Sequence, residues 1–365
     1  MQKKKILHLI TGLGIGGAEK MILQTLPKMQ SDFDNRVCCI TGRGPTGKKL
    51  EEAGIPVYYL DLRSIFDFGT ILKFKKIAKE FRPDVLITYL IHADLFGRIF
   101  GRLFGIKTII CSQRGSLLQW EFLRFFDRLT KSLVTKYIVQ TETAKKELMK
   151  KLNLPENIFV IIPNAINLED FDFEINQEKK KVELGINLGN QNIICVSNLR
   201  RGKGHEYLIE AFEKINENNQ ALNLLIVGDG EQKNNLLQQV SDYDSKNNIY
   251  FLGNRNDIKE ILKISDIFVL PTLAEGMSNA IMEAMSSKLA ILTTNIDANK
   301  ELIENEYSGI LIPARNSYEI EDNLNMLLRD EEKRLRFGKN AHEEIKKRFS
   351  LEVAIKKITN LLNAI

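Results

Sequence analysis

The chain has 365 residues, of which 44% are hydrophobic and 27% are charged, so a disordered or fibrous protein is excluded and two domains are expected. The net charge of +5 is unevenly divided. Residues 1–165 carry 27 Lys and Arg against 15 Asp and Glu, whereas residues 166–365 carry 25 against 32. The basic half predicts contact with an anionic surface, either a membrane or nucleic acid, and a chance imbalance between domains is the alternative.

The N-terminal residues imitate a signal peptide. Lysines 3–5 precede an apolar run, but His8 and then glycines interrupt it, so we interpret residues 6–10 as a β-strand. No stretch reaches 18 uninterrupted apolar residues, and no transmembrane helix is expected. The four cysteines lie in apolar runs without C-x-x-C spacing, which predicts buried, reduced thiols of a cytoplasmic protein rather than a zinc site. They are Cys38, Cys39, Cys111 and Cys195.

Short apolar runs alternate with helical patterns in both halves, which predicts βαβ units and parallel sheets. In the first half, strands are expected at 6–10, 37–41, 57–60, 85–89, 108–111, 137–140 and 159–162, with helices at 19–29, 71–81, 95–104 and 143–151. In the second half, strands are expected at 193–197, 223–227, 249–252, 267–270, 290–293 and 310–312. Helices are expected there at 207–216, 236–240, 258–262, 279–287, 318–328, 331–348 and 351–362.

Residues 165–181 lose this periodicity and are rich in Asn, Asp, Glu and Lys, which is typical of a linker. The pattern therefore predicts an α/β fold of two Rossmann-like domains whose strand-end loops face each other across a cleft. We expect the domains to be residues 1–165 and 166–345. A C-terminal helix, residues 346–365, is expected to pack back towards the first domain.

The first candidate ligand loop is residues 11–19. Gly12, Gly14 and Gly17 satisfy G-x-G-x-x-G between a strand and a helix, and such glycines let the backbone approach a phosphate. An NAD site would need an acidic residue at the end of the second strand, where the chain has Thr41-Gly42-Arg43. NADP therefore stays open, as does a structural turn without a ligand. Residues 42–49 resemble a P-loop, but Pro45 and Lys49 stand where N–H and hydroxyl groups are needed, which argues against an NTPase.

A basic segment, residues 198–205, follows the strand expected at 193–197. It contains Arg200, Arg201 and Lys203 directly before a helix. Cations at a helix N-terminus suit a diphosphate. Because the segment lies at the carboxyl end of a strand, a ligand site is favoured over the alternative, a solvated basic turn.

Glu275 and Glu283 are separated by seven residues across the junction of an expected strand and helix. Eight residues of ideal helix span about 12 Å, so two such carboxylates suit the ends of an extended ligand. Between them Ser278 is an expected N-cap, and the N–H groups of Ser278 and Asn279 suit a phosphate. The helix is apolar nearly all round, which favours a partly buried Glu283 over a solvated glutamate face.

Together these features resemble the family 4 glycosyltransferases, retaining enzymes with the GT-B fold, over essentially the whole chain. The resemblance rests on the order of several short motifs rather than on any one of them. They are Gly16-Gly17-Ala18-Glu19, the His92 segment, Ile162-Pro163-Asn164-Ala165, Lys203-Gly204 and the E-x7-E pair of Glu275 and Glu283.

The resemblance implies a role for each matching residue. Glu275 would contact the transferred sugar near the reacting carbon, and His92, whose alternative role is helix capping, would reach the donor sugar from the first domain. Lys203 would pair with the diphosphate, and Glu283 would bind the ribose. The N–H groups near Ser278 and Asn279 would help to bind the diphosphate. Gly16 and Gly17 would let their loop approach the donor phosphate and the acceptor.

Beyond the matching residues, we also expect donor contacts from Asn198, Arg200, Arg201, Gly276 and Met277. Apart from the resemblance, we expect Gly14 to belong to the same phosphate loop and Arg114 to pair with an acceptor diphosphate.

The chain departs from the family pattern at one position of the donor site. Relatives often have Gly-Arg-Leu where this chain has Ser197-Asn198-Leu199. Asn198 thus replaces the usual phosphate-binding Arg. Arg200 or Arg201 is expected to compensate for it.

The resemblance implies a retaining transferase that needs no metal or other cofactor, because cations and helix N-termini stabilise the departing diphosphate. We expect transfer of a hexose or N-acetylhexosamine, from a UDP-sugar, to a growing lipid-linked glycan in cell-surface polysaccharide biosynthesis. Residues 117–129 mix aromatic residues with Arg, which favours equally a membrane-surface element and an ordinary core helix. We expect a cytoplasmic protein in peripheral contact with the anionic inner face of the plasma membrane.

Alternative functions differ in substrate or in class. One is another GT-B enzyme, either a glycogen- or sucrose-type synthase acting on a soluble acceptor or a sugar-nucleotide epimerase. Another is a non-catalytic nucleotide- or nucleic-acid-binding protein, but the basic residues are scattered and no nucleic-acid motif occurs, so nucleic acid is not an expected partner.

Overall fold

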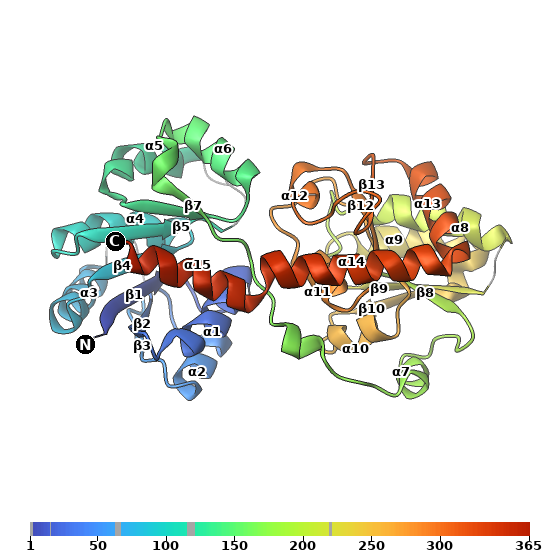
Figure 1. Ribbon diagram of the computed structural model, residues 1–365, viewed down its shortest axis with the longest axis horizontal. Helices are drawn as coiled ribbons and strands as arrows, with labels where there is room; N and C mark the ends of the chain where they lie inside the picture. Colours follow the sequence, from blue (N-terminus) through green and yellow to red (C-terminus); the bar gives the residue numbers. More distant parts are fainter. Residues whose placement is uncertain (1–2, 15, 63–66, 115–120, 219–220) are drawn as a thin grey trace. The chain divides into compact units, whose positions relative to one another are not determined.

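The computed structural model describes residues 3–14, 16–62, 67–114, 121–218 and 221–365, which form two compact units. Unit 1 consists of Met1–Ala165 together with Leu351–Ile365, and unit 2 consists of Ile166–Ser350. Each unit is an α/β domain built on one parallel sheet (Figure 1).

The sheet of unit 1 has seven strands in the order β3-β2-β1-β4-β5-β6-β7. Neighbouring strands pair in parallel, and β1 is hydrogen-bonded to both β2 and β4. The chain therefore winds outward in both directions from β1, as in doubly wound folds. The strands are β1 Lys4–Ile10, β2 Phe33–Cys39, β3 Val57–Tyr59, β4 Val85–Tyr89, β5 Thr108–Ser112, β6 Lys136–Val139 and β7 Phe159–Ile161.

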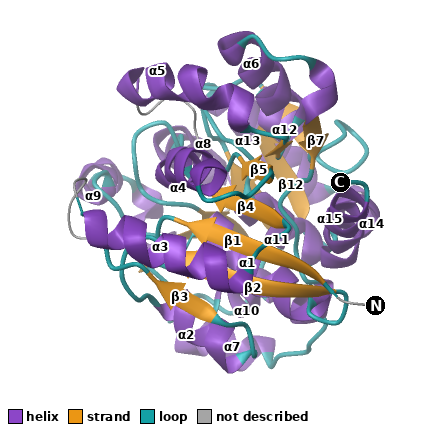
Figure 2. Cartoon of the chain, turned by 90° about the vertical axis from the view of Figure 1, so that its left-hand side faces the viewer, coloured by secondary structure: helices purple, strands orange, loops and turns teal. Residues whose placement is uncertain are grey.

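Helices cover both faces of this sheet (Figure 2). One face packs against α1, α2 and α15, and the other against α3, α4 and α6, so each face has its own apolar core. A π-helical turn, Gly97–Gly101, extends α4. The helices are α1 Gly17–Met29, α2 Pro45–Glu52, α3 Phe68–Phe81, α4 Ile91–Phe96, α5 Glu121–Thr130, α6 Glu142–Leu152 and α15 Leu351–Asn363.

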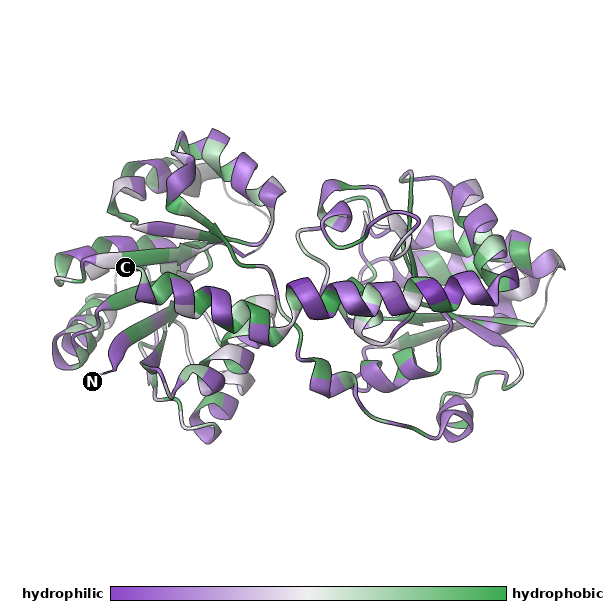
Figure 3. Cartoon of the chain, in the orientation of Figure 1, coloured by the Kyte–Doolittle hydropathy of each residue, from purple (hydrophilic) through white to green (hydrophobic). Residues whose placement is uncertain are grey.

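Unit 2 has a six-stranded parallel sheet in the order β10-β9-β8-β11-β12-β13. Its strands are β8 Gln191–Val196, β9 Leu222–Val227, β10 Ile249–Gly253, β11 Ile267–Leu270, β12 Ala290–Thr294 and β13 Ile310–Ile312. Its helices are α7 Gln177–Glu183, α8 His205–Asn218, α9 Lys233–Ser241, α10 Ile258–Lys263, α11 Asn279–Ser286, α12 Asp297–Lys300, α13 Ser317–Arg329 and α14 Glu331–Phe349. The buried strands are mostly apolar, whereas α14 is polar on its visible side (Figure 3).

The sequence-based interpretation of residues 165–181 as a linker is wrong for much of that segment. Ile166 and Phe171 belong to the core of unit 2, and α7 begins at Gln177 after the Asn176 cap. The buried Lys180 bonds to Asp257 of the α10 loop at 2.5 Å. The polar composition of this segment did not predict a folded element. Its Lys180 is buried in an ion pair, and a hydropathy pattern does not distinguish such a lysine from an exposed one.

The chain passes from unit 2 to unit 1 directly after α14. This helix continues to Phe349, and α15 begins at Leu351 and packs on α1. Leu351, Ala354, Leu361 and Leu362 of α15 are buried in the core that α1 also lines. The four cysteines are buried free thiols, as the sequence predicts, and burial raises the pKa of Cys111 and Cys195 to about 12.

Candidate functional site

The strand order of unit 2 reverses between β8 and β11, and the loops that follow these neighbouring strands lie together. Ligands of open α/β sheets bind at such a reversal, beyond the carboxyl ends of the strands. Gly204 has φ +74°, and a Cβ there would lie 2.1 Å from the carbonyl oxygen of Pro271. The Leu273 N–H also donates to the Gly202 carbonyl at 2.8 Å. Only a glycine at position 204 therefore permits this close approach of the two loops.

Lys203 and Glu275 meet where the two loops join. The Lys203 ammonium donates to Glu275 Oε1, and their side chains are only 8% and 17% exposed. An ammonium has three N–H donors, so the contact with one carboxylate leaves capacity for a second anion. The sequence did not predict that these two residues contact each other.

The pocket beside this ion pair has a volume of about 410 Å³. The N-terminus of α11 forms part of its wall, and Ser278 caps the helix by accepting from the Ile281 N–H. A helix N-terminus carries partial positive charge, which favours an anion. Of the residues expected from the sequence, the pocket wall contains Asn198, Arg200, Lys203, Glu275, Met277, Ser278, Asn279 and Glu283.

The glycine loop after β1 is supported by the segment that resembles a P-loop. Gly16 is the N-cap residue of α1, and Gly14 is exposed, with open space where a Cβ would stand. A Cβ on Gly44 would lie 2.1 Å from the Leu13 carbonyl oxygen, and Thr46 Oγ1 donates to the Gly14 carbonyl at 2.5 Å. Residues 42–49 therefore have a structural role, because they pack against the glycine loop and support its backbone.

His92 is exposed in the first turn of α4, at the carboxyl end of β4. It follows Leu90, which has φ 72° and ψ 151°. This backbone region is almost restricted to glycine and costs about 1–3 kcal/mol for other residues. Such strain is concentrated at functional sites, so it distinguishes the His92 segment from an ordinary helix start.

Arg114 lies at the same edge of the unit 1 sheet, after β5. Its Nη1 donates to Asn164 Oδ1 at 2.7 Å, and its Nε donates to Ser112 Oγ at 3.1 Å. Asn164 Oδ1 also accepts from Gln140 at 2.5 Å. Burial lowers the pKa of Arg114 to about 10, which leaves it charged at neutral pH. These contacts hold the guanidinium with neutral partners.

Two family models match the chain in succession. "Glycosyltransferase Family 4" matches residues 15–170, and "Glycosyl transferases group 1" matches residues 176–344. The chain belongs to the family 4 glycosyltransferases. The matched regions include the glycine loop of unit 1 and the pocket of unit 2.

Similar proteins match most of this glycosyltransferase. The Escherichia coli UDP-Gal:alpha-D-GlcNAc-diphosphoundecaprenol alpha-1,3-galactosyltransferase is 29% identical, covering 98% of this chain and 96% of the relative. The N,N'-diacetylbacillosaminyl-diphospho-undecaprenol alpha-1,3-N-acetylgalactosaminyltransferase of Campylobacter jejuni is 25% identical over 87% and 88%. Anabaena Alr3699/HepE, solved in complex with UDP, has a TM-score of 0.87 at 20% identity, covering 99% of this chain and 100% of that chain. This structural likeness shows the GT-B fold.

Two residues expected in the donor site do not line the pocket of the glycosyltransferase. Arg201 lies in the wall of a different pocket, and Gly276 is exposed between two lining residues. Arg200 and Arg201 are adjacent in one loop but line different pockets. Their positions in the sequence do not predict which of the two faces the donor site. The structure therefore assigns only Arg200 to this wall.

The part of the pocket that follows β9 and β10 was not predicted from the sequence. Gly228, Asn254, Arg255 and Ile258 line it. The Gly-Asn-Arg segment after β10 was a usable signal, because β10 and β8 end at the same edge of the sheet. Arg255 is held by Asp257, with N–O distances of 2.8 and 2.6 Å, and by Glu183 at 3.3 Å. Its charge is therefore largely neutralised within the protein.

The buried His205 side chain holds the loop after β8 through a hydrogen bond to Ser197. Its Nε2 lies 2.9 Å from Ser197 Oγ, and burial, together with the charge of Lys203, lowers its pKa to about 4.

The folded protein therefore favours the neutral ring of His205, and the free energy of unfolding of the wild type should fall as the pH drops from 6.5 towards 4. Relative to His205→Gln, we expect a loss of about 2–3 kcal/mol in the free energy of unfolding between pH 7 and about 4.5. Urea denaturation of both proteins measures this, and a pH-independent difference between them would contradict it.

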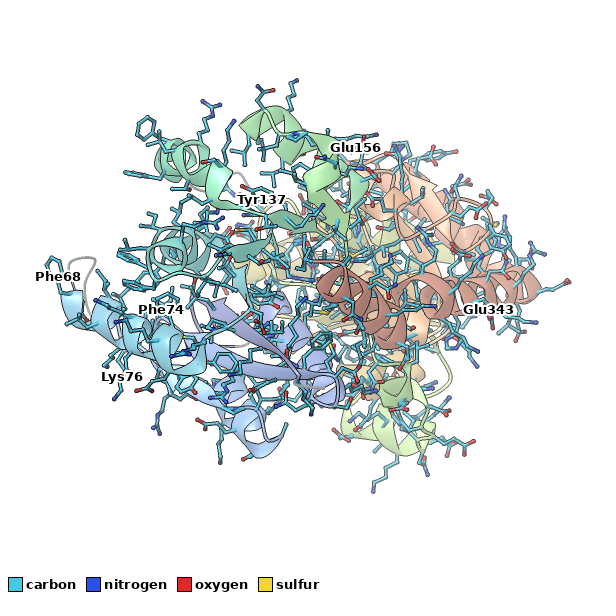
Figure 4. The ribbon with its side chains drawn as sticks, turned by 60° about the vertical axis from the view of Figure 1, so that its left-hand side comes forward. Phe68, Phe74, Lys76, Tyr137, Glu156 and Glu343 are labelled. Carbon is cyan, nitrogen blue, oxygen red and sulfur yellow. The ribbon has the colours of Figure 1, made fainter. Side chains whose placement is uncertain are left out.

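A buried polar network lies beneath α4 and α5 of unit 1. Arg98, in the π-helical turn, is fully buried and pairs with Asp127 of α5. Arg98 also donates to Thr130 at 3.3 Å and stands over the ring of Tyr137, at 5.5 Å from its centroid. Tyr137 lies in the interior of the unit (Figure 4). The network joins α5 to the helix that carries His92.

The described part of α5 exposes apolar side chains. Phe125 and Leu129 are each 62% exposed, and Phe126 packs edge-on against Phe125. Residues 117–120 of the expected membrane-surface element lie outside the described residues. Among the described residues, no helix is both long and apolar enough to span a bilayer.

Proposed function

We propose that this glycosyltransferase transfers a hexose or N-acetylhexosamine from a UDP-sugar to a growing lipid-linked glycan, with retention of anomeric configuration and without a metal ion. The pocket of unit 2 carries the proposal, because it combines Lys203, Arg200 and the N-terminus of α11. The Escherichia coli relative uses UDP-Gal and a diphosphoundecaprenol-linked acceptor, which supports both substrate classes. We place this reaction in cell-surface polysaccharide biosynthesis, which the similarity to a capsular polysaccharide biosynthesis glycosyltransferase of Staphylococcus aureus supports.

In this proposal the donor lies along the pocket with its nucleoside at one end and its sugar at the other. Glu283, half-buried on α11, accepts from the ribose hydroxyls. Lys203 and the α11 N-terminus hold the diphosphate, and Arg200 supplies the cation that Asn198 lacks. Glu275, fixed by Lys203, contacts hydroxyls of the transferred sugar near the reacting carbon.

The chemistry follows from charge development at the leaving group. Cleavage of the bond between the anomeric carbon and the β-phosphate oxygen leaves negative charge on UDP. Lys203 and the helix N-terminus stabilise that charge in a site already organised to receive it. The departing phosphate takes the proton from the acceptor hydroxyl, which attacks from the same face, so configuration is retained.

The acceptor side is assigned to unit 1. Arg114 is a charged group held by neutral partners, which suits the diphosphate of a lipid-linked acceptor. Gly14, Gly16 and Gly17 provide backbone that a phosphate is able to approach. The action of His92 on the donor sugar stays a prediction, supported by the strain at Leu90.

We also assign peripheral contact with an anionic membrane to the outer helices of unit 1. Phe68 and Leu72 are exposed on α3, and Phe68 stands at the outer end of that helix (Figure 4). Phe125 and Leu129 are exposed on α5, within the half of the chain that is rich in Lys and Arg. Apolar insertion combined with attraction to anionic lipid suits an interfacial protein.

The double variant Phe125→Ser/Leu129→Ser removes two of these exposed apolar side chains and should therefore reduce cosedimentation of the protein with phosphatidylglycerol vesicles. Unchanged binding to the vesicles would contradict this assignment.

The transfer reaction is tested with UDP-galactose and UDP-N-acetylglucosamine as donors and a polyprenyl-diphosphate-linked N-acetylhexosamine as acceptor, in the presence of EDTA. We expect product from the lipid-linked acceptor, with an α-linkage in its proton NMR spectrum. Product from free sugar acceptors alone would favour the soluble-acceptor alternative. Formation of a β-linkage, or loss of product with EDTA, would contradict retention or metal independence.

The glycine loop offers a test that separates ligand approach from folding. Gly14→Ala should leave the melting temperature nearly unchanged, because a Cβ at Gly14 meets no atom within 4 Å. If a substrate approaches this backbone, sugar transfer should fall by about tenfold or more. Gly42→Ala is the matched control, since position 42 is equally open in the neighbouring loop. Equal transfer rates for the two variants would exclude the loop from substrate binding.

A further inference from the structure

Unit 2 contains a second pocket, with a volume of about 610 Å³. It shares no lining residue with the donor pocket, although the loop after β8 contributes to both. Arg200 and Lys203 of this loop face the donor pocket, whereas Arg201 and Gly202 face the second one. The two pockets are therefore separate sites built on one loop.

The frame of the second pocket is fixed by hydrogen bonds between its elements. Gly202 accepts from the Leu273 N–H at 2.8 Å, which joins the loops after β8 and β11. The Gln232 N–H donates to the Leu199 carbonyl at 2.8 Å, and Gln239 Nε2 donates to the Glu206 carbonyl at 3.0 Å. These bonds hold α9 against the first turn of α8, so the pocket is preformed.

Two guanidinium groups line this pocket without a partner. Neither Arg201 nor Arg315 forms a hydrogen bond or ion pair with any residue that the structure describes. Arg315, in the loop after β13, has φ 60°, which places a non-glycine residue in the left-handed region. Arginine presents a planar set of donors that matches carboxylate and phosphate, and two of them in one pocket favour an anion.

The rest of the wall suits a sugar. Tyr207, Leu236 and Leu273 provide apolar surface against which a sugar ring is able to lie. Gln232 and Asn235 provide amide groups, bonded to each other at 3.1 Å, that have further capacity for hydroxyls. A concave wall of apolar surface with a few polar groups is typical of a small-molecule site.

We propose that this pocket binds a sugar residue that carries a carboxylate or a phosphate group. Arg201 and Arg315 bind the anionic group, and the amides and Tyr207 contact the ring and its hydroxyls. The two arginines outnumber the one carboxylate of the wall, Glu206, so the pocket keeps net positive charge for one anionic group. The proposal does not depend on the identity of the donor or the acceptor.

Saturation-transfer NMR of the full chain with glucuronate, glucose 6-phosphate and glucose tests the proposal. We expect at least one of the two anionic sugars to bind more tightly than glucose, and their comparison distinguishes a carboxylate from a phosphate ligand. Arg201→Ala/Arg315→Ala should weaken that binding by at least about tenfold, because it removes both charged hydrogen-bond donors. Both residues are exposed, so the variant should fold normally, which circular dichroism verifies.

Two controls locate the bound sugar. Arg200→Ala changes the same loop on the side of the donor pocket and should leave the anionic sugar's affinity unchanged. Saturating UDP should not displace the anionic sugar, because the pockets share no residue. Absence of binding by both anionic sugars, equal affinity in Arg201→Ala/Arg315→Ala, or displacement by UDP would overturn the proposal. If UDP itself does not bind, that result would contradict the proposed donor site but not the proposed anionic-sugar site.

Discussion

Glu275→Gln is expected to reduce the turnover number for sugar transfer by about 10²–10³-fold, in the range observed when one preorganised electrostatic contact of a transition state is removed. The substitution keeps the shape of the side chain and an oxygen that is able to accept from Lys203, so folding should be little affected. It removes the negative charge beside the sugar, where positive charge develops during transfer. The measurement is kcat with saturating donor and acceptor.

The matched control for this variant is Glu343→Gln. Glu343 is exposed on α14 (Figure 4). Its substitution should leave kcat unchanged. A Glu275→Gln variant that turns over at the rate of Glu343→Gln would show that the carboxylate beside Lys203 takes no part in transfer.

Asp127→Ala is expected to destabilise unit 1 by about 3–5 kcal/mol, which is typical when one member of a buried ion pair is removed. Arg98 is completely buried, so the substitution leaves its charge without its principal partner. Hydrogen exchange of β5 and α5 reports the free energy of opening within unit 1. Faster exchange in these segments is the expected result.

The chemical origin of this loss is tested by two further variants. Asp127→Asn keeps a hydrogen-bond acceptor for Arg98 and should lose less stability than Asp127→Ala. Arg98→Met/Asp127→Leu removes both charges and should recover much of the loss, because an apolar pair of similar volume avoids the cost of desolvation. A destabilisation below about 1 kcal/mol in Asp127→Ala would show that water compensates the charge of Arg98.

The strand pattern of the chain could be predicted because both sheets are parallel and buried. Val85–Tyr89, Ile267–Leu270 and Ile310–Ile312 have the predicted bounds, since each is a short apolar run between polar segments. Helix α2 was not predicted as a helix. Its start at Pro45 lies in a glycine-rich segment that suggested a phosphate loop, and packing against Leu13 decides its structure.

The sequence predicted which loops carry the candidate site, but not which side chains of those loops face the pocket. The loops after β8 and β11 carry Lys203 and Glu275, and their convergence follows from strand adjacency. Whether Arg200 or Arg201 faces the pocket depends on backbone direction around Gly202, with φ +88°, which a sequence motif does not specify. The Arg98–Asp127 pair was also missed, because polar residues in helical patterns are usually exposed.

The central claim is that the pocket of unit 2 binds a nucleotide sugar without a metal ion. Thermal unfolding with UDP-, GDP-, ADP- and dTDP-sugars, each with and without EDTA, tests it directly, because a ligand that binds only the folded protein raises its melting temperature. We predict a rise with UDP-sugars that EDTA does not change and that Glu283→Ala removes. No rise with any nucleotide sugar, or a rise abolished by EDTA, would contradict the account.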